Sequence, residues 1–184
     1  MGTRHLICVV QNEEFKLANY GQYDGSPSWQ GADIIEFLNS SFNKEIFSQK
    51  ISLLKPYTDE QISDFFEKSE ITDEMPIYFS RETGAKILPY IQNAESEIPT
   101  ILELEFSGDS QMCEWAYVID LDKDTFEVFK GKNTSPLDKN NPLERFINQP
   151  IQVGKDKVYY QIKHLKTFNL SELPSKDEFK KMFT

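Results

Sequence analysis

The sequence predicts an α+β fold: a mostly antiparallel sheet of about five strands with three to five helices. Segments with strand-like patterns gather near the two ends of the chain, whereas segments with helical spacing are concentrated in its middle. Helices segregated from strands favour this class over an alternating parallel α/β fold. The chain has 184 residues and no Pro- or Gly-rich linker, which fits a single domain spanning residues 1–184.

The strands are expected as two hairpins and one single strand. Residues 4–10 and 14–22 flank a break at Gln11-Asn12, which predicts the first hairpin. Residues 114–121 and 125–130 flank an acidic turn and predict the second. Residues 158–165 form the fifth strand-like segment.

The helices are expected between these hairpins, with one more at the C-terminus. Thr58 and Gln61 form a capping box, in which each side chain bonds the backbone N–H of the other residue. Pro56 ends the helix before it, and Pro89 would kink the helix that contains it or delay its start. The expected helices cover residues 31–42, 44–54, the stretch opened by Thr58, 84–94 and 177–183, with a short one near 143–148.

The composition excludes several functions and locations. A net charge of −10 argues against broad nucleic-acid binding, which needs a basic face. No apolar run approaches the roughly 20 residues that cross a bilayer, and the N-terminal run is too short for a signal peptide. We therefore expect a cytoplasmic protein without membrane contact, in which Cys8 and Cys113 are reduced thiols.

No motif for a cofactor or a metal is found. Glycine-rich phosphate loops are absent, and the four Cys and His side chains lack zinc-ligand spacing. The segment from Asp120 to Gly131 fails as a calcium loop, because its sixth residue is Thr125 instead of Gly. We predict no cofactor and no metal. The acidic stretch 59–74 is most simply a solvated face, and alternatively a surface for a basic partner protein.

The N-terminal hairpin and the loop after it carry the most unusual residues. Arg4 begins an apolar strand, and the hairpin register would bring Asp24 within its reach, so an Arg4–Asp24 ion pair is expected. Polar groups at a sheet end beside a helix start can form a ligand pocket, or they can form a structural clasp. Both alternatives stay open. The candidate ligand-binding residues are Arg4, Gln22, Tyr23, Asp24, Trp29, Glu114 and Trp115.

The same stretch resembles a family of uncharacterised proteins from bacteria, phages and fungi. Those proteins begin with Met-Gly/Ser-Thr-Arg and carry an aromatic-Asp-Gly-Tyr-Pro-like loop. Ser26 stands where that family usually has Tyr, and Trp29 is the aromatic that could replace it. The resemblance implies no settled activity, although the occurrence in phages suggests a role in host–phage conflict. The matching positions are Thr3, Arg4, Tyr20, Gln22, Tyr23, Asp24, Gly25, Pro27, Gly31 and the run 113–122.

The sequence does not identify a reaction and favours a binding module over an enzyme. The ligand would be a small polar or anionic molecule, or a partner protein. One alternative is a hydrolase with Asp24 or Glu114 as the general base. Another is a protein–protein inhibitor or assembly subunit that acts through its acidic face. Oligomerisation is compatible with all three.

Overall fold

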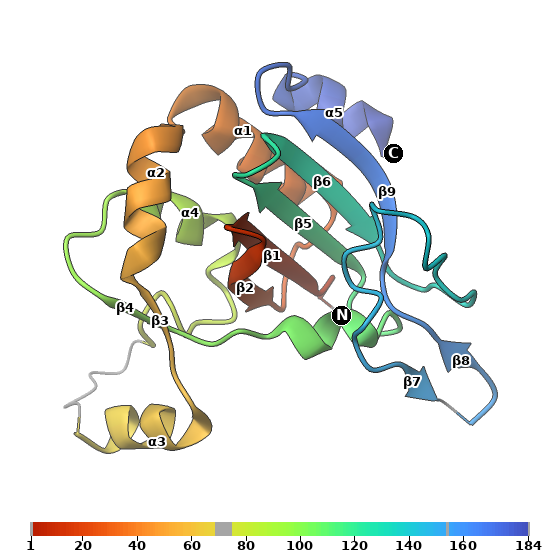
Figure 1. The fold of residues 1–184 in the computed structure, drawn as a ribbon, viewed down its shortest axis with the longest axis horizontal. Coiled ribbons are helices and arrows are strands. Elements are labelled where there is room, and N and C mark those ends of the chain that lie inside the picture. The colour runs from red at the N-terminus through yellow and green to blue at the C-terminus, as the bar shows by residue number, and fades with distance from the viewer. Residues whose placement is uncertain (1, 69–74, 154, 184) are drawn as a thin grey trace.

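A computed structural model describes residues 2–68, 75–153 and 155–183. Its centre is a five-stranded sheet in the order β2-β1-β5-β6-β9 (Figure 1). Antiparallel pairing joins β1 to β2, β5 to β6 and β6 to β9, whereas β1 and β5 run parallel. The strands are β1 (His5–Gln11), β2 (Glu14–Gly21), β5 (Trp115–Asp120), β6 (Thr125–Lys130) and β9 (Lys163–Asn169).

Helices cover one face of this sheet. Their apolar sides meet strand residues such as Ile7, Tyr117 and Phe126 in the larger hydrophobic core. The α3 helix lies apart from the sheet, and none of its described side chains is buried (Figure 1). The helices are α1 (Ala32–Ser40), α2 (Lys44–Lys50), α3 (Asp59–Lys68), α4 (Ile87–Gln92) and α5 (Lys176–Met182).

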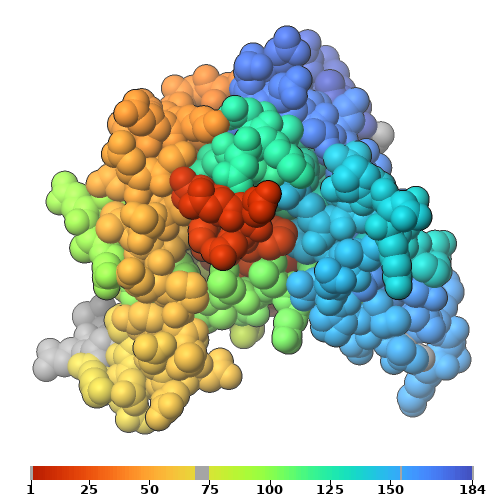
Figure 2. Space-filling view, viewed as in Figure 1, coloured from red at the N-terminus to blue at the C-terminus, as the bar shows by residue number. Residues whose placement is uncertain are grey.

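Irregular segments cover the opposite face of the sheet. Phe106 from one segment and Phe146 from another pack on the smaller core, which contains Cys8, Val118 and Phe129. Two small sheets flank the main one: β3 (Leu54–Pro56) with β4 (Ile98–Thr100), and β7 (Gln152–Val153) with β8 (Val158–Tyr159). In Figure 2, α3 with its neighbours and the region of β7 and β8 project on opposite sides of the β1–β2 turn.

Side-chain caps fix where several helices begin. Asn43 accepts a hydrogen bond from Ile46 N at 3.0 Å and starts α2. Thr58 and Gln61 form the predicted capping box of α3, with N···O distances of 2.9 and 3.2 Å. Ser175 and Glu178 form another at α5. These residues satisfy backbone N–H groups that a helix start leaves without a partner.

The predicted fold class is confirmed, and several predicted elements differ in detail. The helix expected at 44–54 is an α-helix only to Lys50, and a 3-10 turn, Ile51–Leu53, continues it until Leu54 enters β3. The helix expected at 84–94 opens with a 3-10 turn, Gly84–Lys86, and α4 follows with Pro89 in its first turn, where no N–H donor is needed. The strand expected at 158–165 is divided between β8 and the first residues of β9, which runs on to Asn169. Residues 143–148 form turns without a helix.

Candidate functional site

The main chain brings most of the predicted site residues to one end of the sheet. Gly25 N donates to Thr3 O at 2.8 Å, and Glu114 N donates to Arg4 O at 3.1 Å. The first residues of the chain therefore lie between the end of β2 and the start of β5. This position follows from the topology, since β1 and β5 are parallel and begin at the same end.

The prediction of an Arg4–Asp24 ion pair is wrong, because this pair does not occur among the ion pairs of the described residues. Arg4 Nη1 instead donates to Met112 Sδ at 2.9 Å. The strand pairing ends at Gly21, and the next residue, Gln22, donates its N–H to Arg81 O at 2.9 Å. The chain thus turns toward residues 75–86, and the exposed Asp24 follows in a left-handed conformation (φ 55°).

A clasp does hold the loop after β2 against the sheet, through other groups. Tyr117 on β5 donates its buried hydroxyl to Gly25 O at 2.8 Å. His5 is buried beside Gly21 and Gly25, where a Cβ on either glycine would overlap its side chain. We call His5, Gly21, Gly25 and Tyr117 the N-terminal clasp. Packing against a histidine therefore explains why glycine stands at both positions.

His5 is unusual within the N-terminal clasp. Neither ring nitrogen has a hydrogen-bond partner of normal geometry among the described residues. Burial lowers the pKa of this imidazole to about 4, and the nearby Thr3 backbone offsets only part of that effect. The ring is therefore neutral at pH 7.

Three predicted site residues make their side-chain contacts away from Gln22 and Tyr23. Trp29 is 64% exposed on a five-residue π-helical turn, Pro27–Gly31. Glu114 faces Lys132 Nζ at 3.9 Å. Trp115 lies under Lys130 Nζ, 5.3 Å from its ring centroid, and meets the edge of Phe183. These contacts do not connect the three side chains to Gln22 or Tyr23.

Gln22 and Tyr23 line an open cavity of about 550 Å³ at the edge of β2, which residues 75–82 close from the other side. A second cavity of about 180 Å³ adjoins it along β2 and is lined by Asn19 and Tyr20. Both cavities share the wall formed by Met75, Phe79, Ser80 and Arg81. We call the two together the β2-edge groove. Asp24 belongs to a neighbouring cavity of about 360 Å³, which shares Glu82 with the groove.

Arg81 is the central cation of the β2-edge groove. Its guanidinium carbon lies 5.8 Å from the centroid of the Tyr20 ring, and no ion pair holds it among the described residues. Sequence reasoning missed Arg81, because nothing in its own neighbourhood links it to β2. The one available pattern was the mostly large, apolar run from Met75 to Phe79, which ends two residues before Arg81.

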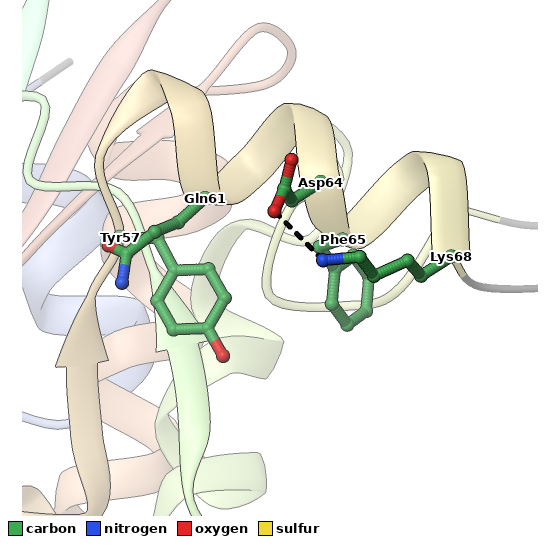
Figure 3. A pocket seen from close by; sticks show the side chains of 5 residues that line it. All are labelled: Tyr57, Gln61, Asp64, Phe65 and Lys68. Atoms are coloured by element: carbon green, nitrogen blue, oxygen red, sulfur yellow. Dashed lines mark hydrogen bonds and ion pairs between the residues drawn. The ribbon is translucent and has the colours of Figure 1, made fainter.

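Another cavity lies along α3 and has a volume of about 420 Å³ (Figure 3). Tyr57 and Phe65 line it together with Asp64 and Lys68. The two charged side chains pair with each other at 2.9 Å. Because its charges are already matched, this cavity offers an incoming ligand less than the groove around Arg81.

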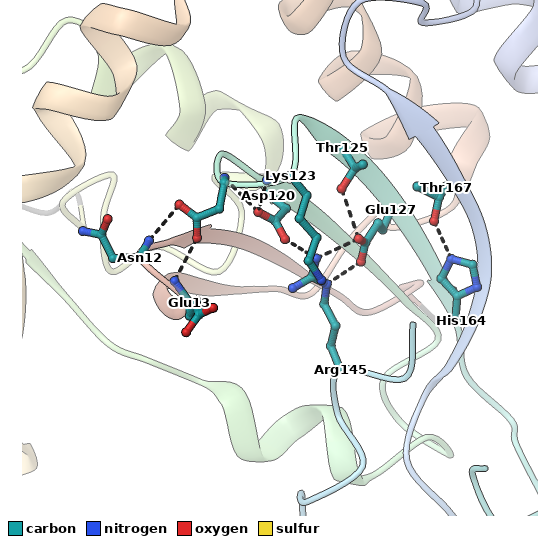
Figure 4. A network of polar contacts seen from close by, with 10 residues as sticks. Asn12, Glu13, Asp120, Lys123, Thr125, Glu127, Arg145, His164 and Thr167 are labelled. Atoms are coloured by element: carbon teal, nitrogen blue, oxygen red, sulfur yellow. Dashed lines mark hydrogen bonds and ion pairs between the residues drawn. The ribbon is translucent and has the colours of Figure 1, made fainter. Parts of the chain in front are cut away.

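The most strongly charged buried cluster is structural. Arg145 bonds both Asp120 and Glu127, and backbone N–H groups and Thr125 supply further partners to these carboxylates (Figure 4). Both carboxylates are thus bonded within the protein, and the cluster is a structural one. Among the described residues, no three His, Cys, Asp or Glu side chains are arranged to hold a metal ion.

Fold and site together define an α+β protein with an arginine-containing groove at a sheet edge. No family model, curated protein or solved structure matches the chain. Each helix within the described ranges is too short or too polar to cross a bilayer.

Proposed function

We propose that the protein is a binding module for a small anionic ligand held in the β2-edge groove. The observation that carries this proposal is Arg81, a cation in the wall shared by two cavities and stacked on Tyr20 without a carboxylate partner in the described chain. A guanidinium binds carboxylates and phosphates in a bidentate manner, which suits such a ligand. Gln22 and Tyr23 supply a polar group and a half-exposed ring beside it.

Binding has more support than the hydrolase alternative. Glu114 lies opposite Lys132, outside the groove. Among the described residues that line the cavity beside Asp24, Thr83 is the one with a hydroxyl side chain, and this hydroxyl already donates to the Ile77 carbonyl. The cavity therefore offers no free hydroxyl for covalent catalysis among those residues, and a general base at Asp24 would have to activate water instead.

Isothermal titration with pyrophosphate and citrate tests the proposal. We expect Arg81→Gln to weaken binding of these anions at least tenfold, because a charge-assisted hydrogen bond is lost. Lys86→Gln is the matched control: it removes one exposed positive charge that lines the neighbouring cavity and leaves the groove intact. Absence of anion binding, or equal losses in both variants, would overturn the proposal. Native mass spectrometry of protein purified from its own host would identify the natural ligand.

A contact with a basic partner protein through α3 is a second candidate. This helix has no buried side chain among its described residues, and it carries Asp59, Glu60, Asp64 and Glu67. An exposed acidic helix favours association with a basic surface through charge complementarity. Replacing Glu60 and Glu67 by Lys would then abolish co-purification of the partner from host extract and leave binding of pyrophosphate unchanged.

A further inference from the structure

The outer edge of β2 has a gap between two segments that cover it. At one side of the gap, Glu103 N donates to Ala18 O at 3.0 Å. At the other side, Gln22 N donates to Arg81 O at 2.9 Å. Backbone groups of a strand point to its two edges alternately, with a period of two residues. The N–H and C=O of Tyr20 therefore point outward, between the two covered positions.

The smaller cavity of the β2-edge groove lies at this gap. Tyr20 lines it, and no backbone partner beyond the strand ladder is found for Tyr20 among the described residues. A ligand in the cavity meets a hydrogen-bond donor and an acceptor side by side on one main-chain residue. Such a pair recognises a group that itself carries an acceptor beside a donor.

Asn19 is a second polar group at this place whose amide lacks a partner within the described part of the chain. The residue is 7% exposed and lines the cavity, and its amide Nδ2 is buried without a hydrogen bond to any described residue. A buried donor left unsatisfied destabilises the fold, so such a group calls for an explanation. A ligand acceptor would satisfy it once the side chain adjusts. Glu103, in the same lining, supplies an acceptor.

The shape of the cavity restricts what enters it. Its walls carry the rings of Tyr20, Phe66, Tyr78 and Phe79, which favour a flat partner. A volume of about 180 Å³ is below the roughly 300–1,000 Å³ of pockets that hold whole drug-sized ligands. The cavity therefore accommodates one ring, while the rest of the ligand extends past Arg81 into the open part of the groove.

We infer that the ligand is an anion carried on a flat ring whose edge presents a hydrogen-bond donor beside an acceptor. The bases of nucleotides and heteroaromatic carboxylates share this chemistry. The ring would enter the cavity at Tyr20 and Asn19, and the anionic group would bind Arg81. This inference rests on the proposed anion-binding function and goes beyond it by naming the ligand class.

Titration with four nucleoside monophosphates (AMP, GMP, CMP and UMP), orotate and ribose 5-phosphate tests the inference. We expect a ring-bearing anion to bind at least tenfold more tightly than ribose 5-phosphate, which has the anion without a flat ring. Preference for a nucleotide or for orotate distinguishes the two sources of the ring. Arg81→Gln should weaken all binding, whereas Asn19→Leu should weaken only the ring-bearing ligands.

A measurement on the wild-type protein keeps the inference testable even if the Asn19→Leu variant does not fold. In ¹H–¹⁵N spectra, the Tyr20 amide should shift on addition of the preferred nucleotide or orotate and stay unchanged with ribose 5-phosphate. Equal affinity for ribose 5-phosphate and all ring-bearing anions, with no Tyr20 shift, would overturn the inference and leave anion binding intact. If none of these anions binds, and pyrophosphate and citrate fail to bind as well, the proposed function fails together with the inference.

Discussion

Arg145 holds Glu127 through two hydrogen bonds, from Nε at 2.5 Å and from Nη2 at 2.8 Å. The same guanidinium also bonds Asp120 on the neighbouring strand. Asp120 and Glu127 are each about 1% exposed. The other core groups on that face of the sheet are apolar. Arg145 comes from the irregular segment that covers this face, so one side chain fastens the segment to β5 and β6 (Figure 4).

Arg145→Gln is expected to destabilise the protein by about 3–5 kcal/mol, because two buried carboxylates lose their cation. The free energy of unfolding from urea denaturation measures this. Lys68→Gln is the control, since its ion pair with Asp64 is exposed and should contribute less than about 1 kcal/mol. Equal losses in the two variants would show that Arg145 does not anchor the segment.

Asp24→Asn should change the free energy of unfolding by less than about 0.5 kcal/mol, as expected for a surface side chain that bonds no other described residue. Asp24 is exposed, and Asn tolerates its left-handed backbone conformation well. Urea denaturation measures the effect. Unfolding of this variant at pH 7 would mean that Asp24 does belong to the clasp.

Tyr117→Phe should destabilise the protein by about 1–2 kcal/mol, because a buried hydroxyl is removed and the Gly25 carbonyl loses its donor. The same denaturation experiment gives the value. Tyr23→Phe is the comparison, as its ring is about half exposed and no hydrogen bond of its hydroxyl is found among the described residues. If both phenylalanine variants match the wild type, Tyr117 does not stabilise the N-terminal clasp.

Gly21→Ala should cost about 1–3 kcal/mol, since its Cβ would overlap the His5 ring in a well-packed core. In a His5→Ala background the same change should cost less than about 1 kcal/mol, because the ring is gone. A double-mutant cycle of unfolding free energies measures this coupling. Additive effects would contradict the packing that we assign to the two residues.

Local sequence patterns predicted the elements well where one periodicity dominated. The two hairpins follow from alternation around short turns, and α3 follows from the reciprocal caps of Thr58 and Gln61. The parallel pairing of β1 with β5 could not be predicted, since more than one hundred residues separate His5 from its partner Trp115. The strands β3 and β4 have three residues each, too few for any period to show.

The candidate site was predicted in part. Gln22 and Tyr23 line a cavity. The sequence pointed to them because turn residues marked the end of the second strand. Arg81 and Asn19 escaped notice. Arg81 reaches β2 only through the tertiary fold, and Asn19 is a single polar residue within an otherwise ordinary strand pattern. The Arg4–Asp24 pair failed because strand register was extended past Gly21, where the chain already leaves the sheet.

His5 should make the protein less stable in acid. Its pKa is about 4 in the folded protein and about 6.5 in an unfolded chain. Between these values the unfolded chain binds a proton that the folded protein excludes, so stability falls as pH decreases from about 6.5 to about 4. The difference corresponds to about 3 kcal/mol at pH 4 relative to pH 7.

The control for this effect is His5→Leu, which places an apolar side chain at the position and cannot titrate. Urea denaturation of both proteins at pH 7, 6, 5 and 4 cancels the contribution of the carboxylates that they share. The wild type should lose about 3 kcal/mol more than the variant over this range. Parallel pH profiles would mean that the folded protein accommodates a charged His5, and the N-terminal clasp would then be open to water.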